Sequence, residues 1–417
     1  MGYTQKAVEG VGGNSFVKFA LTVLTAIKIA ILARILNPAD FGLFALVAVA
    51  IGIIESVTET GINATIIQSE KSVAYFLDTA WVISIGRGLL ISIMMMLLGL
   101  GMRWVYGSPQ LFMLVGLASL IPFIKGFINP AVVTLQKDLR FYSDSLYRLL
   151  LTTVEVIATV LCGVLLRSVS AMVIGLIISA MFEVGLTFAM FQLRPRFVYL
   201  ASRGQEIFYN MRGLNVVSVL GYLIENIDSL IVGKVIGTSG LGVYQNSYGL
   251  THRMNLQLAK SVQHATFPVY AKIVNDRERV KKAFLKTLSS AMIGFFLISL
   301  PFFIAPGFSI HLLLGNKWNE AIPLVRPLLG AGLVQSIVSM AAALLIARKS
   351  YRWLNITMVI NIIVMVPLLI VLGKQYGLSG AVYAVLISRC LALPAVLIGI
   401  WETLRLPAQT QTRSYPR

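Results

Sequence analysis

Charge is scarce in this sequence: only 12% of its 417 residues are Asp, Glu, Lys or Arg, while 57% are hydrophobic. Soluble domains carry about 25% charged residues, which cover the surface that faces water. A soluble enzyme is therefore excluded, and the same apolar excess excludes a disordered chain. The composition predicts a polytopic membrane protein, so the lipid bilayer is a predicted partner.

Cysteine and histidine are also scarce. Cys162 and Cys390, the two cysteines, both lie in apolar runs, so they cannot build a disulfide framework or a metal cage. The sequence has no phosphate-binding loop of the G-x-x-x-x-G-K-S/T type, which argues against ATP hydrolysis. We therefore predict no metal and no organic cofactor. Any step that needs energy would draw on an ion gradient or on the substrate's own supply.

Apolar runs long enough to cross a bilayer, which takes about 20 residues, recur along the chain. The runs 104–124, 327–347 and 353–373 contain no Asp, Glu, Lys or Arg. The sequence predicts twelve spans, at 14–36, 42–67, 77–101, 110–135, 144–166, 169–193, 213–236, 241–269, 284–305, 320–347, 353–373 and 378–401. The predicted fold class is an all-α membrane protein with about twelve transmembrane helices.

Positive charge exceeds negative charge by 35 residues to 17, a formal net charge of +18. If the N-terminus is cytoplasmic, twenty-one Lys and Arg residues fall in the inner connections and termini. The outer connections hold seven, namely Arg34, Arg103, Arg167, Lys234, Lys317, Arg326 and Lys374. Because basic loops resist translocation, this bias predicts that both termini are cytoplasmic. It also explains most of the excess without nucleic acid as a partner.

Six predicted spans lie on each side of a basic segment. We expect an N-terminal six-helix bundle at 1–193, a cytoplasmic linker at 194–212, a C-terminal six-helix bundle at 213–401 and a cytoplasmic tail at 402–417. A shift of 200 aligns ILNPADFGLF at 35–44 with VIGTSGLGVY at 235–244, the same connection in each half. The alternative is that any two short turns between membrane helices look alike. Six spans preserve direction, so the halves are predicted to be parallel repeats, as in transporters whose substrate site lies between the halves.

Cations inside the spans are the candidate substrate-binding residues, because an ionised side chain at membrane depth is costly unless it faces protein or water. Polar side chains share one helix face in the first, second, seventh and eighth spans. The cations assigned to substrate binding are Lys18, Lys28, Arg87, Lys125, Arg253 and Lys260. A wet cavity lined by cations suits a phosphate-bearing anion. The alternative for these residues is ion pairing between helices or snorkelling to the interface.

Acidic residues in the spans are the candidates for coupling to a gradient of H⁺ or Na⁺. The four assigned residues are Glu55, Glu59, Glu225 and Asp228. Glu55 and Glu59 are one helical turn apart, so repulsion between two carboxylates in a low-dielectric setting favours a bound proton or a shared cation. Glu225 and Asp228 form a competing pair. A salt bridge from Glu55 to Lys18 or Lys28 is the structural alternative.

Two further carboxylates, Glu155 and Glu183, stand alone in their spans. They lack an acidic neighbour that would tune their protonation. Pairing with Arg87 or Arg389 would explain them as structural residues.

Short motifs resemble those of bacterial polysaccharide flippases, of the O-antigen and exopolysaccharide type. These flippases belong to the multidrug, oligosaccharidyl-lipid and polysaccharide exporter superfamily. The segment LARILNPADFGL at 32–43 is similar to the family's L-A-R-x-L-x-P-x-D/E-F/Y-G turn between the first two helices. Supporting segments are LQKDLRF at 135–141, GKVIG at 233–237, LGVY at 241–244 and YGLSGA at 376–381. The family has no strict catalytic motif, so the resemblance assigns no site residue.

The resemblance implies two bundles in a V around a cationic central cavity. It implies passage of an undecaprenyl-diphosphate-linked oligosaccharide from the cytoplasmic to the periplasmic leaflet of the bacterial inner membrane. The pathway would be lipopolysaccharide (O-antigen), capsule or exopolysaccharide synthesis, with a polysaccharide polymerase and glycosyltransferases as candidate partners. Many relatives have fourteen helices, whereas twelve are predicted here.

Three alternatives to this function differ in the features they require. A peptidoglycan-precursor flippase of the same superfamily would use similar chemistry. A multidrug exporter of organic cations should have an acidic cavity, which the basic spans disfavour. A membrane polysaccharide polymerase or ligase needs a sizeable outer loop with catalytic His or Arg, and the predicted outer connections are short. The protein is therefore predicted to be a transporter and not an enzyme.

Overall fold

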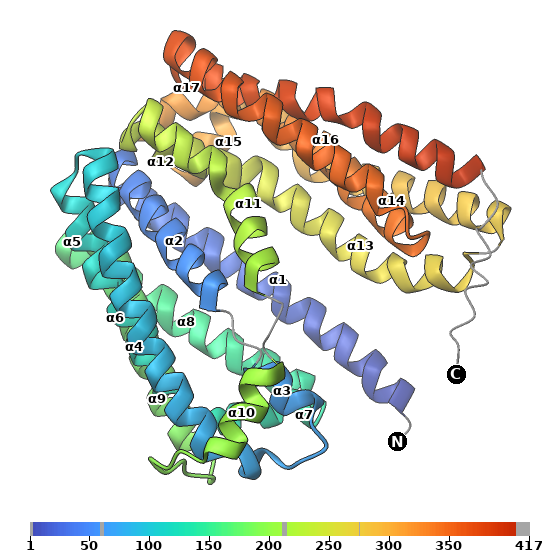
Figure 1. Cartoon of the computed structure of the whole chain (residues 1–417). Helices are drawn as coiled ribbons and strands as arrows, with labels where there is room; N and C mark the ends of the chain where they lie inside the picture. The colour runs from blue at the N-terminus through green and yellow to red at the C-terminus, as the bar shows by residue number, and fades with distance from the viewer. Residues whose placement is uncertain (1–2, 59–61, 211–214, 275, 406–417) are drawn as a thin grey trace. The chain divides into compact units, whose positions relative to one another are not determined.

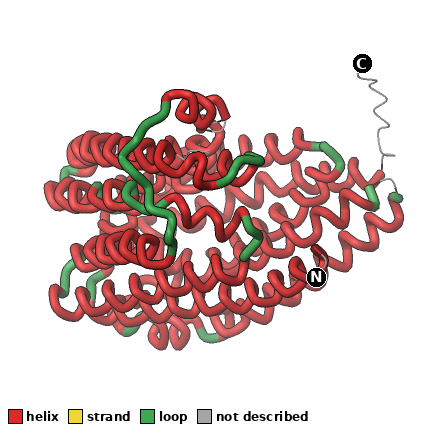
Figure 2. The backbone as a smooth tube through the Cα atoms, turned by 90° about the horizontal axis from the view of Figure 1, so that it is seen from below, coloured by secondary structure: helices red, strands yellow, loops and turns green. Residues whose placement is uncertain are grey.

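Helices joined by short loops make up the structure, a computed structural model that describes residues 3–58, 62–210, 215–274 and 276–405 (Figure 2). No strand occurs among these residues. The predicted all-α architecture is therefore confirmed. The chain forms two compact units, Met1–Asn226 and Ile227–Arg417.

The described residues of the N-terminal unit form ten α-helices, a 3₁₀ turn and the first half of an eleventh helix (Figure 1). The bounds are α1 Tyr3–Ile35, α2 Pro38–Thr58, α3 Ile62–Gln68, α4 Val73–Tyr106, α5 Pro109–Ala118, α6 Leu120–Lys125, η1 Pro130–Val133, α7 Thr134–Lys137, α8 Phe141–Leu166, α9 Ser170–Met190, α10 Ala201–Asn210 and α11 Asn215–Val235. α8 packs between α1 and α9, and α4 packs along α5 and α6. Long apolar helices with short connections are thus stacked side by side.

The C-terminal unit begins within α11. The bounds of its other elements are α12 Thr238–Tyr248, the π-helix η2 Gly249–Arg253, α13 Met254–Lys272, α14 Arg277–Ile304, α15 Pro306–Leu313, η3 Asn316–Ala321, α16 Ile322–Ala347 and α17 Tyr351–Arg405. α16 packs against α13 and α17, which makes it the central helix of this unit. The interior position agrees with its burial, because more of α16 is buried than of any other candidate span in the described residues.

The helices account for the predicted spans with local differences. Among the described residues, seven helices are long and apolar enough to cross a bilayer, or eight if the pair 109–125 and 130–137, bent by 73°, forms one span. α17 covers the last two predicted spans and is bent at Gly377, whose positive φ of 59° favours glycine. α1 and α11 lie at two further predicted spans, and α12, η2 and α13 together cover the predicted span 241–269; these segments carry more charge.

The internal repeat is visible in the positions of the turns. α1 ends at Ile35 and α2 begins at Pro38, while α11 ends at Val235 and α12 begins at Thr238. The same connection therefore recurs at an offset of 200 residues, as the alignment predicted. The second turn contains Gly237 at a φ of 97°, a conformation that glycine adopts without strain.

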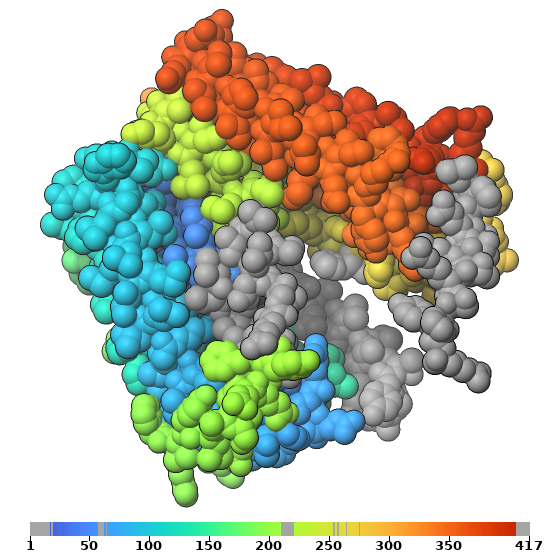
Figure 3. All heavy atoms as spheres, in the orientation of Figure 1, coloured from blue at the N-terminus to red at the C-terminus, as the bar shows by residue number. Residues whose placement is uncertain are grey.

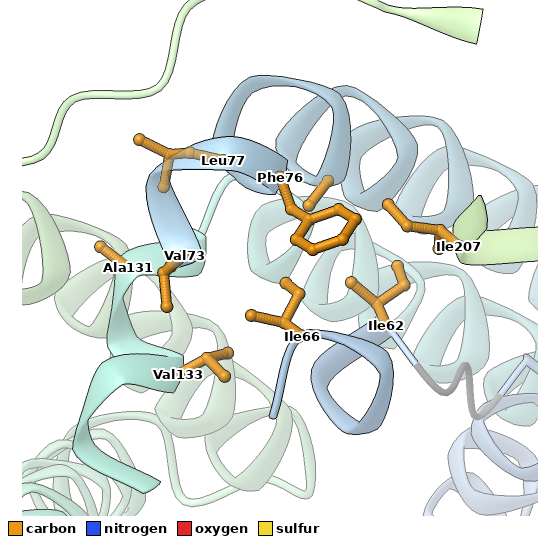
Figure 4. Packing of buried hydrophobic residues seen from close by; sticks show 9 residues of the cluster. Ile62, Ile66, Val73, Phe76, Leu77, Ala131, Val133 and Ile207 are labelled. Carbon is orange, nitrogen blue, oxygen red and sulfur yellow. The ribbon is translucent and has the colours of Figure 1, made fainter. Parts of the chain in front are cut away.

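The predicted linker contains a helix that docks on the N-terminal unit. Ile207 of α10 is fully buried in a cluster with residues of α3, α4 and η1, among them Ile66, Phe76 and Val133 (Figure 4). At the surface, α10 lies against α3 and α4 at one end of the unit (Figure 3). The Arg203 guanidinium donates to the Tyr75 carbonyl at 2.6 Å. The domain limits at 193 and 213 stay predictions, but much of the segment between them is folded.

Candidate functional site

The candidate cation Lys28 lies in a part-buried ion pair of the N-terminal unit. Its Nζ lies 2.7 Å from Glu155 Oε1 in α8, and the two side chains are 16% and 23% exposed. Lys28 was one of the two partners considered for Glu55, and it pairs with Glu155 instead. Glu155 therefore has a cation partner other than the two arginines that were considered for it. A cation and a carboxylate predicted separately form one site.

Close packing of α1 on α8 positions this pair. Further along the same two helices, Leu32 lies so near Gly163 that a Cβ on the glycine would be 2.5 Å from Leu32 Cδ2. Small residues allow membrane helices to approach in this way. Because both residue numbers increase together from the ion pair to this contact, α1 and α8 run in the same direction. The alignment brings the Lys28 ammonium within reach of Glu155.

Glu183, the other lone carboxylate, also has a local partner. It accepts a hydrogen bond of 2.9 Å from the hydroxyl of Tyr147, which is buried between α8 and α9. This partner differs from the predicted arginine. A tyrosine hydroxyl satisfies the carboxyl without adding a charge.

Two other candidate cations lie on neighbouring helices of the same unit. Arg87 and Lys125 stand next to Gly88 in α4 and Gly126 after α6, where the two backbones touch. A Cβ on Gly88 would lie 2.6 Å from the Pro122 carbonyl oxygen. Arg87 is half-buried and Lys125 is exposed. The side chain of Lys18, in α1, lies outside the described residues.

The acidic candidates of the two units have unlike surroundings. Glu55 in α2 is exposed, and Glu59 lies outside the described residues. In α11, Glu225 is exposed, whereas Asp228 is buried at 6% exposure. The two α11 carboxylates therefore do not share one environment, although they are three residues apart. Asp228 is the buried carboxylate of the set.

Asp228 is held by donors from α11 and α12. The Tyr244 hydroxyl donates to Asp228 Oδ2 at 2.7 Å, while the Ser229 amide and hydroxyl donate to Oδ1 at 2.7 and 3.1 Å. The Gln245 amide in turn donates to the Ser229 hydroxyl. Both carboxyl oxygens of Asp228 therefore have hydrogen-bond partners.

A buried arginine lies at the other end of this polar network. Arg389 of α17 donates from Nη2 to the Tyr248 hydroxyl at 3.0 Å and from Nη1 to the Ala331 carbonyl at 3.3 Å. Its Nη1 also lies 3.1 Å from Nδ1 of His252, which is in the π-helix. The Tyr248 ring stacks near Tyr244 and His252, with centroid separations of 5.6 and 4.3 Å. Two tyrosines thus stand between the buried Asp228 and the buried Arg389.

Sequence reasoning named the charged members of this network but missed its tyrosines. Tyr244, Tyr248 and His252 are spaced four residues apart, which places them on one face of the helix, and this spacing was the available signal. Their contacts make Asp228 part of a polar cluster that residues of α11, α12, η2 and α17 form. π-Helical segments such as η2 often occur at functional sites.

The remaining candidates in the C-terminal unit are Arg253 and Lys260. Arg253 ends η2, and its side chain lies outside the described residues. Lys260 in α13 is half-buried. Both follow the buried network along the same helical stretch.

Comparisons with known proteins agree with the predicted family. Residues 31–323 match the family described as "Polysaccharide biosynthesis protein". The lipopolysaccharide biosynthesis protein WzxC of Escherichia coli (strain K12) is 23% identical over 399 residues, which are 93% of this chain and 80% of that protein. The succinoglycan biosynthesis transport protein ExoT of Rhizobium meliloti (strain 1021) is 20% identical over 76% of this chain and 64% of its own length.

A solved structure shows the fold. The lipid II flippase MurJ in an inward closed conformation matches with a TM-score of 0.69 and 14% identity, over 94% of this chain and 89% of that chain. The family and the fold are those of membrane transport proteins and not of enzymes, as the sequence predicted. The resemblance to polysaccharide flippases is confirmed.

Proposed function

Because the chain belongs to the polysaccharide biosynthesis protein family, we propose that it carries an undecaprenyl-diphosphate-linked oligosaccharide across the bacterial inner membrane. The substrate would move from the cytoplasmic to the periplasmic leaflet by alternating access, for synthesis of O-antigen, capsule or exopolysaccharide. Both termini would lie in the cytoplasm, as the basic bias of the connections indicates. Glycosyltransferases would act before this step, and a polymerase would act after it.

The observation that carries the proposal is a lysine inside a long helix of this fold that is paired with one carboxylate and keeps part of its side chain exposed. Lys28 keeps 16% of its side chain exposed although it lies in the packed part of α1. In our proposal Lys28 contributes to a wet lumen with Lys18, Arg87, Lys125, Arg253 and Lys260. Ammonium and guanidinium groups that have lost hydration recover it from phosphate oxygens, so such a lumen favours a diphosphate.

The coupling ion in this proposal is H⁺ or Na⁺, bound at carboxylates of the spans. Glu55, with Glu59, is the candidate site of the first half, and Glu225 and Asp228 are the candidates of the second half. Asp228 is buried, whereas Glu55 and Glu225 are exposed, so the two glutamates are better placed for exchange with solution. Exposure to water allows an ion to bind and leave within a transport cycle.

Transport in cells tests the substrate assignment. A gene deletion should trap lipid-linked oligosaccharide on the cytoplasmic face, and plasmid-borne wild-type protein should release it. Lys28→Ala combined with Arg253→Ala should fail to release it at normal protein level. Lys281→Ala, on the exposed start of α14, is the matched control and should behave as wild type. Full transport by the double variant would reject the cation assignment.

Reconstituted vesicles test the coupling assignment. With an imposed gradient of H⁺ or Na⁺, at least one of Glu55→Gln and Glu225→Gln should fold normally and lose its response to the gradient. If both variants respond as the wild type does, these carboxylates do not couple transport.

A further inference from the structure

The Lys28–Glu155 pair differs in its setting from the other close lysine–glutamate pair described in the N-terminal unit. Lys71 and Glu206 also lie 2.7 Å apart, but their side chains are 46% and 32% exposed, and Lys71 stands in the connection between α3 and α4. Lys28 and Glu155 are 16% and 23% exposed and lie within long helices that pack together. One pair is freely solvated, and the other is partly withdrawn from solvent.

The exposed part of the inner pair must face water or polar groups. An ionised lysine in contact with hydrocarbon costs at least about 2.5 kcal/mol, and a charged pair is avoided on a lipid face for the same reason. The pair is therefore open to an ion or a head group that enters from solution.

A carboxylate and a phosphate compete for one ammonium. Both present oxygen acceptors, but a diphosphate carries more negative charge and more oxygens than a single carboxylate, so it binds a lysine more strongly. A neutral or cationic passenger has no such advantage over Glu155. The carboxylate therefore acts as a built-in competitor that only an anionic head group removes.

Loss of Lys28 would leave Glu155 without a counter-charge in its own surroundings. On α9 and α7, Glu183 accepts from Tyr147, and Lys137 donates to the carbonyls of Ile66, Ser69 and Lys71. On α1, which also packs against α8, the other cations are Arg34, six residues beyond Lys28, and Lys18, whose side chain lies outside the described residues. On α8 itself, Arg148 pairs with Asp144 at 2.9 Å. A part-buried carboxylate that loses its cation is stabilised by taking a proton from water.

The geometry points to a specific exchange, which rests on the function proposed above. We propose that the diphosphate head group of the substrate displaces Glu155 from Lys28, and that the released Glu155 carboxyl takes up one proton. Glu155 is then a specificity-determining residue that links anion binding to proton uptake. The ammonium exchanges one anionic partner for another, and the O–H bond of the neutral Glu155 carboxyl forms with a proton that hydronium or buffer in the solvent gives up.

Calorimetry on the purified full-length protein in detergent tests the exchange with pyrophosphate as the probe. Titrations in two buffers of different ionisation enthalpy give the number of protons taken up per ligand bound. The wild type should take up about one proton more than Glu155→Gln. Glu155→Gln should bind pyrophosphate about tenfold more tightly, because its competitor is gone. Lys28→Ala should lose the binding.

Glu206→Gln is the matched control, since it removes the carboxylate of the solvated pair; its affinity and proton count should equal those of the wild type. If Glu155→Gln does not fold, Glu155→Asp retains the charge at shorter reach, and it should bind more tightly than wild type with proton uptake retained. Equal affinity and proton count in the wild type and in both Glu155 variants would overturn the inference. A second titration with undecaprenyl diphosphate identifies the anion's source: tighter binding than pyrophosphate indicates the lipid head group, and equal or weaker binding indicates a free phosphate anion.

The outcomes for the inference and for the transport function are separable. If Lys28→Ala abolishes transport in cells while Glu155 variants bind pyrophosphate as the wild type does, the exchange is wrong and the flippase assignment stands. If the exchange is measured as expected but the gene deletion traps no lipid-linked oligosaccharide, the flippase assignment is wrong and the exchange stands.

Discussion

Tyr244→Phe tests whether the buried Asp228 is ionised, which decides what kind of coupling residue it can be. The substitution removes one hydroxyl and keeps the aromatic ring, so packing in the C-terminal unit is preserved. The hydroxyl donates to Asp228 Oδ2 at 2.7 Å, and Tyr244 is fully buried. After the substitution the carboxylate keeps only the two bonds from Ser229.

The expected loss follows from the charge on the acceptor. A hydrogen bond to a charged group contributes about 1.5 to 3 kcal/mol, and a neutral one contributes about 1 kcal/mol. Because solvent cannot replace the lost donor at this depth, we expect Tyr244→Phe to lower the free energy of unfolding by about 2 kcal/mol. In an Asp228→Asn background the same change should cost only about 1 kcal/mol.

Unfolding by sodium dodecyl sulfate in mixed micelles, followed by tryptophan fluorescence, measures these differences. Tyr270→Phe is the matched control, because Tyr270 is also buried and its hydroxyl has no hydrogen-bond partner among the described residues. That change should stay within about 0.5 kcal/mol of wild type. If Tyr244→Phe costs no more than Tyr270→Phe, the hydroxyl does not hold an ionised Asp228. Asp228 would then be free to act as the proton acceptor of the second half.

Three further predictions concern packing, topology and charge. Gly88→Ala should destabilise the N-terminal unit by about 1 to 3 kcal/mol, because its Cβ would meet the backbone of the neighbouring helix. Gly86→Ala has open space around it and should not destabilise the unit. The same unfolding experiment in detergent distinguishes the two variants. A cysteine at Arg279 should be labelled by a membrane-impermeant reagent only in inside-out vesicles, and labelling from outside intact cells would refute the cytoplasmic assignment. The hydrogen bond from Lys71 to Glu206 raises the pKa of Lys71. The ion pair is therefore fully formed below the ordinary lysine pKa of about 10.4 and is lost as the pH rises through the raised pKa. Glu206→Gln should lower the pKa of Lys71 in an NMR titration of the lysine side chains.

The positions of the helices could be predicted from the sequence because they depend on properties of single segments. Apolar length decides where a membrane helix forms, and glycine or proline decides where it stops. The turns at 35–38 and 235–238 and the break of α17 at Gly377 were visible in this way. Family membership was readable for the same reason, since its motifs are contiguous turns.

The bend between α6 and α7 and the folding of α10 were less visible. Residues 110–135 are mostly apolar, with Lys125 as the only charged residue, but a break after Lys125 turns the chain by 73°. α10 contains few apolar residues, and only its contacts show that Ile207 is buried against α3 and α4. A short amphipathic helix gains its stability from the surface on which it docks, and that surface is distant in the sequence.

The sequence by itself determined which ionisable groups lie in the spans, because the apolar run around each group shows that it lies at membrane depth. Only the tertiary structure decided how they are paired. Lys28 meets a carboxylate 127 residues away, and Asp228 is linked to Arg389 through Tyr244 and Tyr248. Such pairings depend on which helices are neighbours and on the rotation of each helix about its axis. Both are properties of the packed bundle, in which a rotation of one residue position turns a side chain by about 100°.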